Sequence, residues 1–207
     1  MTQYRKITEK IAGKLNLKEA YLFYCLALKS DFNTYQSHIK QESLAEFYGV
    51  KKTDNVRKGL YKFQSCGLIQ INKTDEKGQY GKFNRCHYQL DTEHYVLITD
   101  RLYSENISSD LKGFLILLKC KCLNGTNTSK FSQNKLAKEL NLSTGSVSKY
   151  MKLAMDNGYI NKDEKGSHLL REDIFLLTAE TPNTFLREHF PKTKPPIKKD
   201  DYRFILD

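Results

Sequence analysis

The chain has 207 residues, enough for one large domain or two of roughly 100 residues each. Hydrophobic residues make up 39% and charged residues 28%, which allows a packed core and argues against a disordered chain. Apolar runs such as 114–118 are far shorter than the roughly 20 residues of a membrane span, and the polar N-terminus lacks a signal-peptide core. Five cysteines, an odd number, favour free thiols in a reducing compartment. We therefore expect a cytoplasmic protein without a membrane-spanning helix.

The charge of the chain is strongly positive. Lysine and arginine total 34 against 24 aspartate and glutamate, which gives a net charge of +10. Such an excess favours polyanionic partners, with nucleic acid first among them. A lysine-rich surface that only contacts solvent gives the same net charge. The positions of the basic residues are therefore better evidence for nucleic-acid binding than the net charge itself.

An internal repeat organises the chain, with an offset of about 90 residues. The first copy begins with QESLAEFYGV at 41–50 and reaches NKTDEKG at 72–78. The second begins with QNKLAKELNL at 133–142 and reaches NKDEKG at 161–166. The repeat predicts two similar domains, which we assign to residues 1–95 and 96–180.

Each copy predicts the same elements in chain order. An apolar helix comes first, over 18–29 or 109–122, because apolar residues recur there at helical spacing. A polar loop, a short helix, a tight turn and a longer helix follow, and the longer helix ends at Gly67 or Gly158. A hairpin comes last. Its expected strands are 68–71 with 82–90, and 159–160 with 167–170.

The longer helix of the second copy is a candidate DNA-reading helix. Asn141 and Leu142 form the predicted turn, and Ser143 suits the N-cap. At 100° per residue one face is apolar, and the other carries small polar residues followed by lysines. Small residues let a helix enter a major groove, where lysines reach phosphates or guanine edges. The expected buried face is Val147, Tyr150, Met151 and Ala154. The candidate DNA-binding residues are Thr144, Gly145, Ser146, Ser148, Lys149 and Lys152.

The longer helix of the first copy has the same character. Val56, Leu60 and Phe63 share the face that we expect to be buried. Asparagine pairs bidentately with adenine and arginine with guanine, so polar residues on the other face suit base recognition. The candidate DNA-binding residues are Asn55, Arg57, Lys58, Tyr61 and Lys62. Asp54, near the helix start, complements the helix dipole and favours a capping role.

The two hairpins are candidate wings that contact phosphates or the minor groove. Lys82 and Arg85 are the DNA-contact candidates of the first, and Lys162 and Lys165 those of the second. Each hairpin also carries an Asp-Glu pair, which repels phosphate. A charged surface turn is therefore the open alternative.

The order of helix, helix, helix and hairpin over residues 15–175 resembles the winged helix-turn-helix superfamily in tandem form. Each copy contains the dipeptide Leu-Ala, followed along the chain by Val, Lys and Leu and then by Gly-Leu-Ile or Gly-Tyr-Ile. This pattern is similar to that of bacterial regulators, plasmid replication initiators and phage replisome organisers. The resemblance implies a mainly α fold with small β-hairpins, an α+β class. It also implies sequence-specific binding of double-stranded DNA, in replication initiation or its control on a plasmid or mobile element. A transcriptional regulator and a protein-interaction module remain alternatives, with a homodimer or replication proteins as partners.

Sites for other chemistry are not predicted. The five histidines are isolated in sequence, and no HExxH motif or phosphate-binding GxxxxGK[ST] loop is present. Cys120 and Cys122 lack the second ligand pair of a structural zinc site and suit buried positions. We expect no catalytic residue, metal or cofactor, and so no enzyme. Residues 181–207 contain all four prolines and several lysines, which predicts an extended basic arm.

Overall fold

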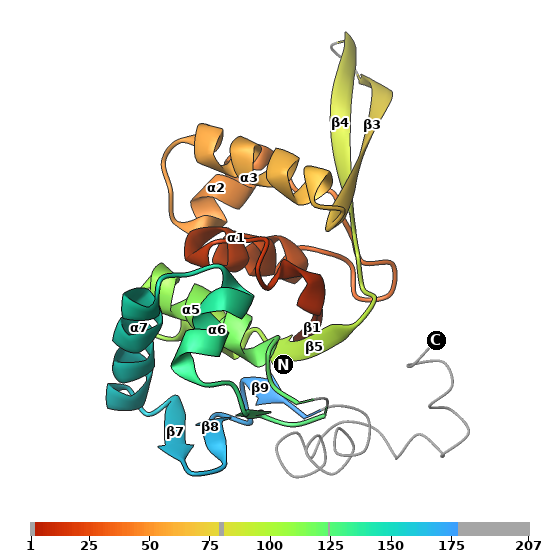
Figure 1. The fold of residues 1–207 in the computed structure, drawn as a ribbon. Helices are drawn as coiled ribbons and strands as arrows, with labels where there is room; N and C mark the ends of the chain where they lie inside the picture. The colour runs from red at the N-terminus through yellow and green to blue at the C-terminus, as the bar shows by residue number, and fades with distance from the viewer. Residues whose placement is uncertain (1–2, 79–80, 124, 178–207) are drawn as a thin grey trace, which may run out of the picture.

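The structure, a computed structural model, describes residues 3–78, 81–123 and 125–177, and for 74–78 and 81–85 it describes the main chain alone. The predicted C-terminal arm lies outside the described residues. The fold is mixed α+β, with helices packed around a common core and small antiparallel sheets, as the sequence predicts at that level (Figure 1). Within the described part of the chain, no helix is long and apolar enough to cross a membrane.

Two sets of elements follow the same order along the chain. The first set is α1 (Leu17–Leu28), β2 (Gln36–Ser37), α2 (Gln41–Tyr48), α3 (Thr53–Ser65), β3 (Ile69–Gly78) and β4 (Gly81–Leu90). The second set is α5 (Ser109–Lys119), β6 (Thr128–Ser129), α6 (Gln133–Leu140), α7 (Thr144–Asp156), β7 (Ile160–Asp163) and β8 (Gly166–Leu169). Each set also forms one sheet with the last strand in the middle, β2-β4-β3 and β6-β8-β7. We call these sets the first and second units.

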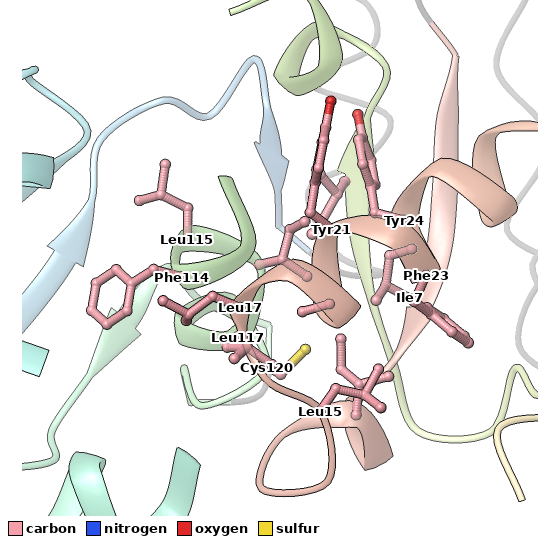
Figure 2. Close-up of a cluster of buried hydrophobic side chains, with 14 of the residues drawn as sticks. Ile7, Leu15, Leu17, Tyr21, Phe23, Tyr24, Phe114, Leu115, Leu117 and Cys120 are labelled. Carbon is pink, nitrogen blue, oxygen red and sulfur yellow. The ribbon is translucent and has the colours of Figure 1, made fainter. Parts of the chain in front are cut away.

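The first helices of the two units start at side-chain caps and pack against each other. Asn16 caps α1 in a capping box with Glu19, and Ser108 caps α5 by accepting a hydrogen bond from the amide of Leu111. Most side chains of both helices are buried, because each helix has neighbours on several sides. Figure 2 shows side chains of α1 and α5 together in the core.

A third sheet joins the ends of the described chain. β5 (Tyr95–Thr99) lies between β1 (Tyr4–Thr8) and β9 (Phe175–Leu176), antiparallel to both. The short helices η1 (Glu9–Ile11) and α4 (Arg101–Ser104) flank this sheet in sequence. The boundary predicted between residues 95 and 96 falls inside β5, and one continuous cluster of buried residues spans both units.

Two predicted elements have different bounds in the structure. The apolar helix expected over 109–122 ends at Lys119, with Cys120 as its C-cap. The first hairpin is much longer than expected, because β3 pairs with β4 up to Gly78 opposite Gly81. The outer part of this hairpin projects away from the helices (Figure 1). Because this outer part covers no core, its strands need no alternation of apolar and polar residues. The charged sequence therefore predicts a turn where the structure has paired strands, and that prediction is wrong.

Candidate nucleic-acid interface

The helix-turn-helix segments of the two units have the same turn. Gly49 ends α2 and Asn141 ends α6, and both adopt the left-handed conformation, with φ of 88° and 52°. In each turn the amide of the next residue donates to a carbonyl five residues back: Val50 to Ala45, and Leu142 to Ala137, both at 2.9 Å. The matching hydrogen bonds close α2 and α6 with the same C-terminal cap, so the chain leaves both helices in the same way.

Both longer helices end as the sequence predicts. Gly67 and Gly158 have φ of 70° and 73°. Beyond them, the amides of Leu68 and Tyr159 donate to carbonyls in the last helical turn, each at 2.9 Å. The start of α7 is also confirmed, because the Ser143 hydroxyl accepts a hydrogen bond from a main-chain amide of the first turn. In α3 the N-cap is Lys52, with no side-chain cap, and Asp54 lies in the first turn instead.

The buried faces of both helices are confirmed. Val147, Met151 and Ala154 of α7 are buried, and Val56, Leu60 and Phe63 of α3 are buried. Tyr150 is half-buried: its ring stacks on Phe114 of α5 at 5.7 Å between centroids, and its hydroxyl donates to the Asp110 carboxylate at 3.4 Å. The apolar faces therefore fix the rotation of α3 and α7 about their axes and determine which side chains face solvent.

The exposed face of α7 presents most of its predicted residues to solvent. Thr144, Gly145, Ser148, Lys149 and Lys152 are exposed. Ser146 is half-buried, and its hydroxyl lies 2.8 Å from that of Ser143, so it belongs to the helix cap. The five exposed residues form a surface of small side chains at the helix start, followed by two lysines.

The candidate residues of α3 divide into two stripes. Arg57 and Tyr61 are exposed, and the Arg57 guanidinium donates to Gln41 of α2 at 3.4 Å. Asn55 and Lys58, which are also exposed, line a cleft of about 540 Å³ together with the half-buried Lys62, between α3, the start of α1 and the start of α5.

Lys62 differs from the other lysines of the two helices. It is half-buried, and its ammonium forms an ion pair of 2.5 Å with Glu19, the residue that completes the capping box of α1. Sequence reasoning missed this pairing, because the two residues are 43 positions apart. Among the predicted α3 contacts, Lys62 therefore already has an intramolecular partner.

The second hairpin keeps both of its predicted lysines, Lys162 and Lys165, exposed. The Asp163 carboxylate accepts hydrogen bonds from the amides of Lys165 and Gly166, at 2.7 and 3.1 Å, and lies 2.9 Å from the ring of His168. The bond from His168 lowers the pKa of Asp163 most, and the two turn amides add to the shift. This carboxylate is committed to the turn, so its repulsion of a phosphate is partly compensated.

The first hairpin contributes main-chain positions. In β4, Lys82 and Arg85 lie opposite Lys77 and Thr74 of β3, and their side chains lie outside the described part. Lys73, nearer the base of the hairpin, is exposed.

Two histidines that are isolated in the sequence meet in the fold. His38 and His87 are in direct contact through their Nδ1 atoms, with ring centroids 4.5 Å apart. The sequence does not indicate this pair, because the two histidines are 49 residues apart and meet only where β2 pairs with β4. Over the described residues, no group of three or more histidine, cysteine, aspartate or glutamate side chains could hold a metal ion.

The cysteines are free thiols where the structure describes them. Cys120 is buried, as predicted, and Cys122 is half-buried. Burial raises the pKa of Cys25 and of Cys122 to about 12, which keeps these thiols protonated and unreactive near neutral pH.

The relative placement of the two longer helices is clear in Figure 1. α3 lies above α1, and α7 lies beside α5 on the left of the view, with its axis in a different direction. Comparisons of the chain with protein-family models, curated proteins and solved structures found no match in any of the three.

Proposed function

We propose that the chain is a non-enzymatic protein that binds double-stranded DNA sequence-specifically through two winged-helix units, the first within residues 1–95 and the second within residues 96–180. In this proposal α3 and α7 enter major grooves as recognition helices, and the hairpins β3-β4 and β7-β8 act as wings on the phosphate backbone. The role that we propose is replication initiation, or its control, on a plasmid or mobile element.

One observation carries the proposal: the helix-turn-helix occurs twice with the same left-handed turn, at Gly49 and Asn141, and each is followed by a helix with an exposed polar face. A single basic amphipathic helix has an ordinary solvated face as its simplest explanation. A second copy with the same turn, the same glycine at its end and the same hairpin after it makes that explanation weaker. The net charge of +10 adds an electrostatic attraction to phosphate.

Anisotropy of labelled duplex and single-stranded DNA across a salt series tests the proposal. We expect duplex binding whose logarithmic affinity falls linearly with the logarithm of salt concentration, because each phosphate contact releases counterions. Absence of duplex binding at low salt would reject the proposal. Selection from a random DNA pool then yields the specific site.

Variants of both helices identify the binding faces. Arg57→Ala and Lys149→Ala each remove an exposed cation from a recognition helix, and each should reduce the salt slope by about 1. Lys14→Ala removes the same charge from a residue whose ammonium donates to the carbonyl of Cys66, beyond the end of α3. This control should bind as the wild type does. Equal losses in all three variants would indicate general charge attraction instead of docking through α3 and α7.

Footprinting on the selected DNA separates replication from transcription. Repeated sites at an origin support replication initiation, whereas a site over a promoter supports the alternative of a transcriptional regulator. Two units on one face of the duplex would protect sequences about 10 bp apart, one helical turn.

A protein-interaction role for the second unit has its own supporting observation. On α7, Leu153 is 36% exposed and Met155 is 39% exposed, next to the lysines of the proposed DNA face. Exposed apolar side chains of this size are frequent at protein interfaces. Sedimentation of the wild type and of Leu153→Ser/Met155→Ser tests this role. If the variant loses self-association while keeping DNA affinity, α7 contributes to an interface between copies of the chain.

A further inference from the structure

The sheet of the first unit carries a histidine pair on its solvent side. β2 and β4 are antiparallel, with Ser37 opposite Tyr88. The next pair in the same register is His38 and His87. The two rings are nearly perpendicular, at 81°, and their Nδ1 atoms touch. Two histidines that are distant in sequence thus have their Nδ1 atoms facing each other.

The alternation of the strands places this pair where a solute can reach it. Ser37 and Tyr88 point into the core and are buried, so their neighbours His38 and His87 point the other way. His38 is exposed and His87 is half-buried. On the far side of His87 the register places Asn72 of β3, also exposed.

The chemistry of two facing Nδ1 atoms is that of a bidentate ligand. Two imidazole nitrogens that point at each other cannot both carry a proton, so at least one presents a lone pair. Imidazole nitrogen is a preferred ligand of Zn²⁺, Ni²⁺ and Cu²⁺. At metal–nitrogen distances of about 2.0–2.1 Å, two nitrogens on one ion lie about 3 Å apart. Small rotations of the two side chains reach that separation.

We propose that His38 and His87 form a binding site for a divalent first-row transition-metal ion of the Zn²⁺, Ni²⁺ and Cu²⁺ class, bound through both Nδ1 atoms. With two protein ligands and water in the remaining positions, the site is open and weaker than a four-ligand structural site. The bound ion would join β4, at the base of the long hairpin, to the segment that leads into α2. It would therefore fix the hairpin relative to the helix-turn-helix. The site does not depend on the DNA-binding proposal.

Calorimetric titration of the untagged full-length chain with ZnCl₂ and with NiCl₂ tests the site. His38→Ala and His87→Ala should each weaken the binding by about tenfold or more, since even outer-shell partners of metal ligands contribute factors of this size. The double variant should bind no more weakly than either single variant, because loss of one ligand already removes the chelate. His94→Asn removes another exposed histidine, keeps a residue type that tolerates the positive φ of 45° at this position, and should bind as the wild type does.

Equal binding by wild type and all variants would overturn the proposal. It would assign the ion to other groups, for instance the half-buried thiols of Cys66 and Cys86. Absence of binding to the wild type at millimolar metal would overturn it as well.

Hydrogen exchange of the wild type tests the location without any variant. Zn²⁺ should slow amide exchange at 36–38 and 87–89, where the ion would link the two strands. Protection confined to other segments, or none at saturating metal, would contradict the assignment.

Discussion

Gly113 of α5 lies directly against the main chain of Leu17 at the start of α1. A Cβ atom at position 113 would come within 1.9 Å of the Leu17 carbonyl oxygen and 2.6 Å of its carbonyl carbon. Only glycine permits this approach, which brings the first helices of the two units together. Figure 2 shows Leu17 among the core side chains of both helices. The packing between the units therefore depends on the absence of a single methyl group.

We expect Gly113→Ala to lower the free energy of unfolding by about 3 kcal/mol, because the clash is with backbone that cannot rotate away. The helix propensity gained by alanine, about 1 kcal/mol, is smaller. Urea denaturation measures the difference. Gly145→Ala is the matched control: its Cβ meets nothing within 4 Å, so its stability should be unchanged or up to about 1 kcal/mol higher. Equal stabilities of the two variants would contradict the close packing of α1 on α5.

Lys119, the last residue of α5, is only 2% exposed. Its ammonium donates to the carbonyl of Thr126 at 3.0 Å and to the side-chain oxygen of Asn127 at 2.5 Å. Burial lowers the pKa of Lys119 to about 8. The ordinary value for lysine is about 10.4, so between these two values the unfolded chain binds more protons than the native chain. Lys119 therefore makes the free energy of unfolding rise with pH across this interval, by about 3 kcal/mol in all.

Buried thiols make the free energy of unfolding fall as the pH rises, which is opposite to the effect of Lys119. The prediction therefore concerns the difference in stability between the wild type and a variant that lacks this lysine. Because burial raises the pKa of Cys25 to about 12, unfolded thiols lose protons first and stability falls above pH about 9. We expect the stability of the wild type minus that of Lys119→Met to increase from pH 8 to 10.5, in urea titrations under reducing conditions. Lys121→Met, which removes a lysine paired with Glu139, should show no such increase. A difference that does not change with pH would contradict the assignment.

Local features of the sequence predict the helices well. The spacing of Val147, Met151 and Ala154 identifies the buried face of α7, because helical periodicity is set by residues three and four apart. The third sheet was not predicted. It pairs β1 with β5 and β5 with β9, and each pair joins segments more than 70 positions apart. No short turn connects the paired strands, so the local sequence does not indicate the pairing.

In the candidate site, too, the sequence predicts the features that depend on one helix and not those that depend on tertiary contacts. Exposure of Lys149 and Lys152 follows from the helical wheel alone. The ion pair of Lys62 with Glu19 and the contact of His38 with His87 are set by tertiary packing. No pattern of residue types within one segment could have indicated them.

The shared turn of the two helix-turn-helix segments gives a stability test. Asn141 holds a left-handed conformation that asparagine tolerates and alanine does not, so Asn141→Ala should cost about 1–2 kcal/mol. Asn141→Gly should be neutral or slightly stabilising. Gly49→Ala should cost about as much as Asn141→Ala, because a Cβ there touches nothing within 4 Å and the penalty is conformational alone. Thermal denaturation compares the variants, and equal stability of Asn141→Ala and Asn141→Gly would rule out the left-handed turn.

The ion pair of Lys62 makes a prediction about DNA affinity that rests on the proposed function. Lys58 is exposed, whereas Lys62 is held 2.5 Å from the Glu19 carboxylate. A phosphate would have to displace that carboxylate to contact Lys62. In anisotropy titrations across a salt series, Lys58→Ala should reduce the slope of logarithmic affinity against logarithmic salt by about 1, and Lys62→Ala should change it little.

Glu19→Gln provides the complementary variant. Glutamine preserves the capping box of α1 but removes the charge that holds Lys62, so the lysine becomes available to a phosphate. We expect this variant to bind duplex DNA more tightly and with a steeper salt slope, and we expect the gain to disappear in the double variant Glu19→Gln/Lys62→Ala. A gain that persists in the double variant would show that Glu19 acts through the overall charge and not through Lys62. A loss for Lys62→Ala as large as that for Lys58→Ala would show that DNA displaces the carboxylate in the wild type.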